Sequence, residues 1–355
     1  MASLVRWLYR YTTTENSACQ RITYPQFIHT LLIEVKFELR AFLPYNQRVS
    51  VATNVSINAA TRLCAVYGHP IRHSASPAMQ NAGMAAMRLN WRYLACEVHP
   101  DNLRAAIEGA KVMGFIGLNL TVPHKLLAVS MVDAIDARAK SWGAVNTIVF
   151  ETRNQAGEWV PLYQVAEEAV NEVRSHGFNT DADAIVQSLK EDFQWPDLRG
   201  AAVLLLGAGG AARAAALRLA EEDVGRLHLV NRTEKNARAL SDSIKDRHPR
   251  ADVVLGYPRD PVDLVINATS LGLKPGDALP IDLAWLQSRR PARVYDMIYR
   301  PMETAFLKAA RSAGCRVSNG TGMLLHQGVE ALKLWSGLQP PAGIMRAALE
   351  KNIHD

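Results

Sequence analysis

The chain has 355 residues, of which 48% are hydrophobic and 21% charged, so it is long enough to form two globular domains with sizeable cores. Its formal net charge is +6, but lysine and arginine are scattered rather than clustered with aromatic residues, which argues against a nucleic-acid partner. No run approaches the roughly 18 uncharged apolar residues that a membrane helix needs, which argues against a membrane protein.

The cysteines and the first 61 residues indicate little about chemistry. No Cys-x-x-Cys pair is present, so Cys19, Cys64, Cys96 and Cys315 are expected to be free thiols in a reducing cytoplasm. Residues 1–61 are treated as an extension of unassigned function, which weakly imitates a transit peptide but lacks a secretory apolar core. An alternative hypothesis is that this extension comes from an over-long start-site assignment.

From residue 62 onward, short apolar runs alternate with helical patterns, which predicts parallel sheets built from strand–helix–strand units. The first half is expected to contain strands at 63–67, 92–98, 117–122 and 144–150, and helices at 77–89, 101–113 and 125–139. Residues 161–175 look inserted, and the spacing of their apolar side chains predicts an amphipathic helix packed on the domain.

A second unit begins near residue 198. The apolar run at 201–206 is typical of a parallel strand buried on both faces, and a glycine turn, an alanine-rich helix and a strand at 226–230 follow in Rossmann order. The later elements are expected to be strands at 262–267 and 293–297, and helices at 304–313, 321–335 and 344–351.

The predicted fold class is therefore α/β with two domains. The first is an open α/β domain formed by residues 62–183 plus 318–355, because the C-terminal helices are expected to return to it. The second is a Rossmann domain formed by residues 184–317.

The glycine turn follows a strand and precedes a helix, which is the context of a dinucleotide-binding loop. A glycine at the first position can make the tight turn, and one at the third lets the backbone approach a pyrophosphate, which would sit on the helix N-terminus. A tight turn that binds nothing is the alternative. The cofactor-binding residues predicted here are Gly207, Gly209, Gly210 and Ala211.

The end of the next strand predicts which cofactor is used. NAD-binding domains place an acidic residue there to hold the ribose 2′-hydroxyl. This chain has Asn231, Arg232 and Thr233, with Lys235 close by, and a guanidinium suits a 2′-phosphate where a carboxylate would repel it. We therefore predict NADP over NAD, although Glu234 lies beside Arg232, and a merely solvated Arg232 is the competing interpretation.

The loop at residues 69–77 presents two hydroxyl groups, those of Ser74 and Ser76, next to the start of a helix. Together they can bind a carboxylate, which predicts recognition of an anionic substrate. The alternative is that Ser76 only caps its helix. His69 and His73 lack helical i, i+4 geometry because Pro70 intervenes, so no metal site is expected.

Lys125 is the residue expected to carry proton transfer. Reduction of a ketone needs a hydride and a proton for the developing alkoxide, and an ammonium group at a strand end can orient, stabilise and donate. Asp181, in the run Asn-Thr-Asp, could pair with it and keep the ammonium group protonated. Each of these residues taken separately is more often a surface charge than a catalyst.

From about residue 62 to the C-terminus, the chain resembles the shikimate dehydrogenase family. The resemblance rests on motifs that match in order: residues 74–77 (Ser-Ala-Ser-Pro), 119–125 (Asn-Leu-Thr-Val-Pro-His-Lys), 145–147 (Val-Asn-Thr), the glycine loop with 231–233, 296–301 (Asp-Met-Ile-Tyr-Arg-Pro) and 322–327. It implies reversible, NADPH-dependent reduction of 3-dehydroshikimate to shikimate, a step of aromatic amino-acid and chorismate biosynthesis. The expected partner is this small molecule, and the expected state is a monomer or homodimer.

The resemblance also implies residue roles. Lys125 and Asp181 would be the catalytic pair, and Ser74 and Ser76 would bind the substrate carboxylate. The ring hydroxyls would be bound by Asn119 or Thr121, Asn146, Asp181 and Gln327. Thr269, Met297 and Tyr299 would lie near the nicotinamide or the cleft.

Two departures from the family pattern are visible. Ala182 stands where the family usually has glycine after Asn-Thr-Asp, and alanine resists a positive φ. The insertion at 161–175 lies just upstream of Asp181 and could displace it. Two other functions stay open: an NAD-dependent quinate/shikimate dehydrogenase, and a ligand-binding homologue without turnover.

Overall fold

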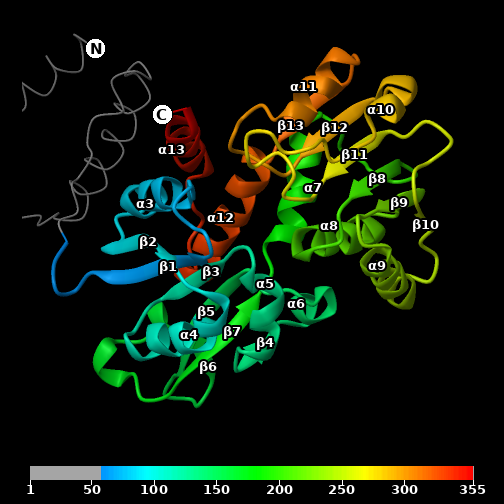
Figure 1. Cartoon of the computed structure of the whole chain (residues 1–355). Helices are drawn as coiled ribbons and strands as arrows, with labels where there is room; N and C mark the ends of the chain where they lie inside the picture. The colour runs from blue at the N-terminus through cyan, green and yellow to red at the C-terminus, as the bar shows by residue number, and fades with distance from the viewer. Residues whose placement is uncertain (1–56, 355) are drawn as a thin grey trace, which may run out of the picture. The chain divides into compact units, whose positions relative to one another are not determined.

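The computed structural model describes residues 57–354, so most of the predicted extension at 1–61, including Cys19, lies outside the described residues. The described chain forms two β-sheets flanked by helices, which confirms the predicted α/β class (Figure 1). None of the helices in this part of the chain is both long and apolar enough to cross a membrane.

The first sheet has the strand order β2-β1-β3-β5-β7-β4, and β6 pairs with β5. The prediction of purely parallel pairing is wrong here, because β5 runs antiparallel to both β3 and β7. A buried apolar run reads the same in either direction, so the sequence did not specify this reversal. The strands are β1 (Arg62–Gly68), β2 (Trp91–Glu97), β3 (Gly117–Leu120), β4 (Ala134–Ile135), β5 (Thr147–Arg153), β6 (Trp159–Pro161) and β7 (Val173–Phe178).

The helices of this half are mostly short. The predicted helix at 125–139 is wrong, because α5 ends after one turn and β4 follows, where it pairs with β7. The predicted amphipathic helix at 161–175 is also wrong. The segment forms the end of β6, two 3₁₀ turns, η4 (Leu162–Gln164) and η5 (Glu167–Ala169), and the start of β7, because pairing with β5 overrides its apolar spacing. The helices are α3 (Ser76–Ala86), α4 (Leu103–Val112), α5 (His124–Leu127), α6 (Ala137–Trp142) and α7 (Asp181–Asp192); a further 3₁₀ turn, η2, spans Pro100–Asn102 and another, η3, spans Ala128–Ser130.

The second sheet is entirely parallel, with the order β10-β9-β8-β11-β12-β13 that defines a Rossmann arrangement. Side chains of its first strand alternate between two cores: Val203 and Leu205 lie in one, and Leu204 and Leu206 in the other. The strands are β8 (Ala202–Leu206), β9 (Arg226–Val230), β10 (Val253–Leu255), β11 (Leu264–Asn267), β12 (Arg293–Asp296) and β13 (Arg316–Asn319). The helices are α8 (Gly210–Glu221), α9 (Glu234–Arg247), α10 (Leu283–Arg289) and α11 (Ala305–Ser312).

The last two helices, α12 (Thr321–Ser336) and α13 (Ala342–His354), return to the first sheet, as predicted. Both contact α3, which Figure 1 shows beside α13. The indole N–H of Trp335 donates to the Ile148 carbonyl oxygen at 3.0 Å. Gly117 makes room for this contact, because a Cβ there would collide with the indole ring. The C-terminal helices therefore cover the strands that carry the polar motifs.

Candidate active site

Lys125 and Asp181 meet at the carboxyl edge of the first sheet. Lys125 follows β3 in the short helix α5, and Asp181 is the first residue of α7. The Lys125 Nζ donates to Asp181 Oδ2 at 2.8 Å, and the two side chains are only 16% and 5% exposed. Neither departure from the family pattern displaces Asp181, since both ends of the 161–175 segment pair with β5 and Ala182 adopts a regular helical conformation.

Two asparagines beside this pair belong to a buried hydrogen-bond network. Asn119 Oδ1 accepts from the Tyr93 hydroxyl at 2.8 Å, and its Nδ2 donates to Thr147 Oγ1 at 3.0 Å. Asn146 Oδ1 accepts from the backbone N–H of Thr180 at 2.7 Å. Burial raises the pKa of the Tyr93 phenol well above its usual value, so Tyr93 is a neutral donor. These bonds fix the direction in which each amide points.

The loop at residues 69–77, which carries Ser74 and Ser76, contacts Tyr299 in the segment that follows β12. Tyr299 contacts the Ala75 backbone and the Ser74 hydroxyl, and burial raises the pKa of its phenol. Ser76 is buried at the start of α3, and its N–H donates to Ser74 Oγ at 3.3 Å. The idea that Ser76 only caps the helix is wrong, because Ala75 occupies the cap position and makes no side-chain cap bond.

Thr121 and Gln327, two of the predicted substrate-binding residues, differ in accessibility. Thr121 follows β3 and is half-buried, whereas Gln327 lies on α12 with only 8% exposure. The Gln327 amide donates to the Leu324 carbonyl oxygen at 2.8 Å.

The glycine loop has the conformation that dinucleotide binding needs. Gly207 has a φ of 114°, and a Cβ there would lie 2.9 Å from the Ala268 carbonyl oxygen. Gly209 has open space around its Cα, and Gly210 begins α8, so free backbone N–H groups face outward. A Cβ on Gly210 would touch Lys125 Cβ at 3.7 Å. The start of α8 therefore lies next to Lys125 and Leu126.

The end of β9 presents exposed polar groups. Arg232, Thr233 and Lys235 are exposed, and Asn231 Nδ2 donates to the Thr233 carbonyl oxygen at 2.9 Å. Glu234 pairs with Arg238 at 2.6 Å one turn along α9. Within residues 57–354, Arg232 forms no ion pair, so its guanidinium is available to an anion.

A second buried hydrogen-bond network, centred on Asp296 and Asn267, orders the loops that follow β11 and β12. Asp296 Oδ1 accepts from Asn267 Nδ2 at 2.9 Å, and its Oδ2 accepts from Thr304 Oγ1 at 2.6 Å. Asn267 Oδ1 in turn accepts from Thr269 Oγ1 at 2.7 Å, and its carbonyl oxygen accepts from Met297 N at 3.0 Å. Burial raises the pKa of Asp296 to about 6. This network thus holds Thr269 and Met297, two of the three residues expected near the nicotinamide or the cleft.

Sequence reasoning missed several members of these networks. Thr147 and Asp296 lie within quoted motifs and Thr180 adjoins Asp181, so the sequence offered a usable signal for all three, although not for their bonding partners. Tyr93 had no such signal, because only the fold shows that it reaches Asn119.

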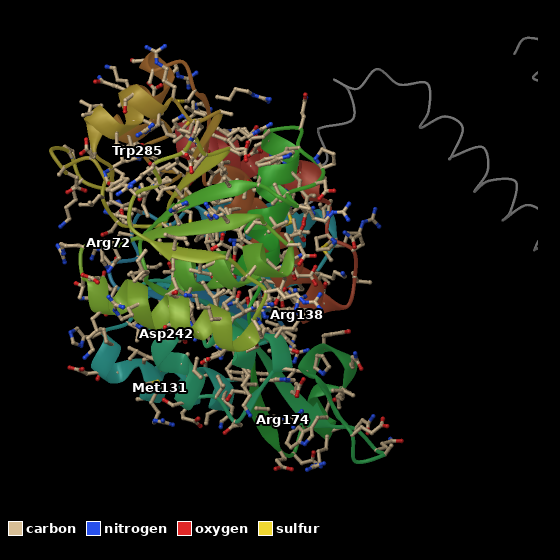
Figure 2. The ribbon with its side chains drawn as sticks, turned by 90° about the vertical axis from the view of Figure 1, so that its right-hand side faces the viewer. Arg72, Met131, Arg138, Arg174, Asp242 and Trp285 are labelled. Atoms are coloured by element: carbon tan, nitrogen blue, oxygen red, sulfur yellow. The ribbon has the colours of Figure 1, made fainter. Side chains whose placement is uncertain are left out.

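An ionic cluster joins the start of α7 to the helices α6 and α8. Arg138, labelled in Figure 2, contacts Asp183 at 2.9 Å, and Arg218 of α8 reaches the same carboxylate at 2.8 Å. The paired guanidinium groups lower the pKa of Asp183 against the opposing effect of burial. Helices α6, α7 and α8 are therefore tied together within two residues of Asp181.

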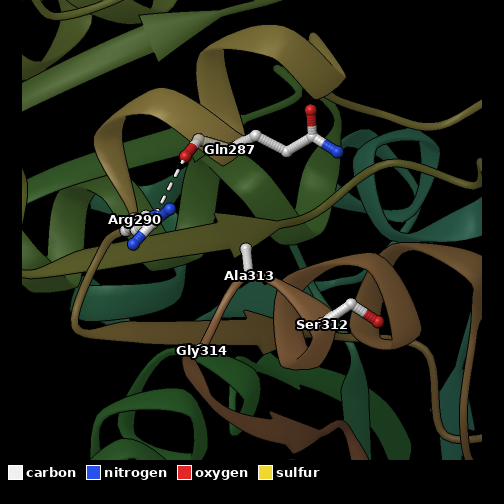
Figure 3. Close-up of a pocket in the computed structure, with 5 residues that line it drawn as sticks. All are labelled: Gln287, Arg290, Ser312, Ala313 and Gly314. Carbon is white, nitrogen blue, oxygen red and sulfur yellow. Dashed lines mark hydrogen bonds between the residues drawn. The ribbon is translucent and has the colours of Figure 1, made fainter.

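A surface hollow on the second sheet's side of the molecule lies away from this site. It has a volume of about 480 Å³ and lies where α10 and α11 end, as Figure 3 shows for Gln287, Arg290, Ser312, Ala313 and Gly314. These helices end just before β12 and β13 begin, so the hollow is at the amino edge of the second sheet, opposite the glycine loop. Within residues 57–354, no group of three or more His, Cys, Asp or Glu side chains could hold a metal ion.

A buried Lys–Asp pair on one α/β unit, facing the dinucleotide loop of a Rossmann unit, defines the class of nicotinamide-dependent oxidoreductases. Comparisons with known proteins narrow this class. Three family models match: "Shikimate dehydrogenase substrate binding domain" at residues 66–148, "Shikimate / quinate 5-dehydrogenase" at 188–271, and "Shikimate 5'-dehydrogenase C-terminal domain" at 320–350. The chain belongs to the shikimate dehydrogenase family.

Individual relatives support the same assignment. The shikimate dehydrogenase (NADP(+)) of Moorella thermoacetica is 40% identical over 306 residues, which cover 84% of this chain and 95% of that protein. A crystal structure of a shikimate dehydrogenase in complex with NADP+ matches with a TM-score of 0.72 and 34% identity, covering 84% of this chain and 98% of that one. The Thermus thermophilus enzyme in complex with NADP(H) and shikimate has a TM-score of 0.67 at 31% identity, covering 82% and 99%.

Proposed function

We propose that this chain catalyses the reversible, NADP-dependent reduction of 3-dehydroshikimate to shikimate. The observation that carries the proposal is the Lys125–Asp181 pair, 2.8 Å apart, together with the position of Lys125 Cβ next to Gly210 at the start of α8. A hydride donor bound on that loop and a proton donor on the first sheet would then approach one carbonyl group from two sides.

The cofactor residues fit NADP. The pyrophosphate would lie on the N-terminus of α8, at Gly207, Gly209, Gly210 and Ala211. Arg232, with Asn231, Thr233 and Lys235, would hold the 2′-phosphate, since the one nearby carboxylate, that of Glu234, is engaged by Arg238. Thr269 and Met297 would line the nicotinamide end. The bound nicotinamide supplies or accepts the hydride.

The proposed substrate-binding residues form two groups, one for the carboxylate of the substrate and one for its ring hydroxyls. The Ser74 hydroxyl lies next to the Tyr299 hydroxyl and accepts from the Ser76 N–H, and we assign these three residues to the carboxylate of the substrate. The ring hydroxyls would contact Asn146, Gln327 and either Asn119 or Thr121. Of the last two, Asn119 is buried with both polar atoms partnered, as Asn146 also is, whereas Thr121 is only half-buried.

The chemistry of the protein's own residues is a proton transfer. In the reduction, Lys125 Nζ donates a proton to the oxygen that gains negative charge as the carbonyl is reduced. Asp181 accepts a hydrogen bond from the ammonium group and keeps it aimed into the site. In the reverse direction, Lys125 would accept the proton of the shikimate hydroxyl.

Three further proposals concern organisation. We place the domain boundaries at 62–183 plus 318–355 and at 184–317, which puts β1–β7 in the first domain and β8–β12 in the second. A cytoplasmic location is consistent with the free thiols of Cys64, Cys96 and Cys315. A monomer or homodimer is proposed, and sedimentation would measure which forms.

Steady-state rates of the wild-type chain with shikimate or quinate, each with NADP or NAD, test the function. The highest kcat/KM is expected for shikimate with NADP. A preference for quinate with NAD would instead favour the quinate/shikimate dehydrogenase alternative. Binding of shikimate without any turnover would favour a ligand-binding homologue.

A further inference from the structure

One peptide group joins the backbones that carry Lys125 and Asp181. The Ala144 carbonyl oxygen accepts a hydrogen bond from Asn179 Nδ2 at 2.9 Å. The N–H of the same peptide group, which belongs to Val145, donates to the Lys125 carbonyl oxygen at 2.8 Å. Because a peptide group is planar and rigid, the Lys125 backbone and the Asn179 side chain are held at a fixed separation on its two sides.

Asn179 also fixes the start of α7. Its Oδ1 accepts from the backbone N–H groups of Asp181 at 3.0 Å and Ala182 at 3.2 Å. These N–H groups lie in the first turn of the helix, where no intrahelical acceptor exists. The orientation of the Asn179 amide follows from its partners, since two donors face Oδ1 and a carbonyl faces Nδ2.

The hydrogen bonds close into a ring. It runs from the Lys125 backbone through the 144–145 peptide group and the Asn179 amide to the Asp181 backbone, and returns through the ion pair between Asp181 Oδ2 and Lys125 Nζ. Asn179 is 8% exposed, so water has little access to replace its bonds. The separation of the two charged groups is therefore set through Asn179 as well as by their own attraction.

From this geometry we infer that Asn179 is a positioning residue that sets the distance and orientation of the Lys125–Asp181 pair. The inference rests on the proposed function for its effect on turnover, but not for its effect on geometry. Asn179 touches neither charged group of the pair with its side chain, and acts only through the backbone of Asp181 and the 144–145 peptide group.

The rest of α7 is anchored without Asn179. Thr180 N donates to Asn146 Oδ1 at 2.7 Å, and Asp183 is held by Arg138 and Arg218. Loss of Asn179 should therefore leave the helix in place while the carboxylate of Asp181 gains freedom. This makes the role separable from a general contribution to folding.

Two substitutions remove the link to Ala144 in different ways. Asn179→Asp keeps the shape and the acceptor for the helix start but removes the donor, and Asn179→Ser keeps an acceptor but is too short to reach Ala144. The control is Asn154→Ser, because Asn154 makes the same kind of turn, accepting from Ala156 N and Glu158 N at 2.9 Å, on the β5–β6 hairpin.

The expected result is a fall in kcat for shikimate oxidation of about 10- to 100-fold in both Asn179 variants, the size expected for misplacement of a reacting group by about 1 Å. The KM for NADP should stay within about twofold, and the control should change neither constant by more than about twofold. A kcat equal to that of the control in both Asn179 variants would overturn the inference.

A double-mutant cycle separates positioning from a merely structural effect. In a Lys125→Ala background, Asn179→Ser should lower the remaining turnover by less than about threefold, because the pair that it positions is already absent. If the fold-losses of kcat in the two single variants multiply in the double variant, Asn179 does not act through the Lys125–Asp181 pair.

Crystal structures of Asn179→Ser and Asn179→Asp supply a readout that does not depend on activity. The Nζ–Oδ2 separation is expected to lengthen from 2.8 Å to beyond hydrogen-bonding distance. An unchanged separation in both variants overturns the inference even if the wild type does not act on shikimate. A lengthened separation with an inactive wild type would refute the proposed function alone.

Discussion

The carboxyl edges of the two sheets are built differently. At the first sheet, Asn119, Asn146 and Asp181 are buried and already hydrogen-bonded to protein partners. At the second sheet, Gly209 borders open space and Arg232 is exposed without an ion pair inside the described range. One edge is preorganised, and the other is left open for a ligand to complete.

This difference matches the two tasks of the proposed reaction. Groups that transfer a proton must be held within a fraction of an ångström, which buried hydrogen bonds achieve. A loop that binds a large anionic cofactor must instead leave its backbone N–H groups and its guanidinium free. Substitutions at the first edge should therefore change kcat, and those at the open loop should change KM.

The largest expected effect is at the preorganised edge. Lys125→Ala should lower kcat about 10²- to 10⁴-fold, because the proton donor is removed, while calorimetric binding of NADP is unchanged. Lys140→Ala, an exposed lysine on α6, is the matched control and should behave as the wild type. Comparable losses of turnover in the two variants would remove the proposed proton donor from the account.

At the open edge, Arg232→Asp should raise the KM for NADP about 100-fold and change the KM for NAD far less, because a carboxylate repels the 2′-phosphate. Arg250→Asp makes the same change of charge on the same domain and is expected to leave both constants unchanged. An equal loss for NADP and NAD would show that Arg232 does not read the 2′-phosphate.

Asp296 tests whether the second sheet also contains a preorganised part. Its pKa is raised from 3.8 to about 6 by burial, so the stabilisation that it gains from being protonated is full below about pH 3.8 and is lost as the pH rises through 6. Asp296→Asn should therefore gain stability relative to the wild type between pH 4 and 7, by up to about 3 kcal/mol. Urea unfolding at pH 4.5 and 7.5 measures this difference, and a pH-independent difference would contradict it.

The smallest effect is expected at Gly209. Gly209→Ala places a methyl group in open space, so Tm should not change, but the KM for NADP should rise about tenfold as the methyl group blocks the pyrophosphate. Gly207→Ala is the contrasting variant: its φ of 114° and the nearby Ala268 carbonyl should lower the free energy of unfolding by about 1–3 kcal/mol. If Gly209→Ala bound NADP normally, the loop would not be the pyrophosphate site.

Much of the second sheet was predictable, because its signals are local. The apolar run of β8, the glycine turn and the alanine-rich helix α8 occur in sequence order, and each has its own pattern. The first sheet was predicted less well. The direction of β5 and the strand at the end of residues 161–175 depend on pairing partners distant in sequence, which periodicity does not encode.

The candidate site shows the same division. Motif residues such as Lys125, Asn146 and Asp181 could be selected from the sequence, but their supporting residues could not. Tyr93 looked like an ordinary strand residue, and the roles of Asn179 and Asp296 arise from bonds to elements far along the chain. Sequence reasoning thus found the groups proposed to contact ligands better than the groups that orient them.

The most direct test is a crystal structure of the wild-type chain with NADP+ and shikimate bound together. The account predicts the pyrophosphate on the N-terminus of α8 and the reacting hydroxyl of shikimate within about 2.6–3.2 Å of Lys125 Nζ, between that group and the nicotinamide ring. Shikimate bound away from Lys125 and Asp181, or a nucleotide bound away from the glycine loop, would contradict it.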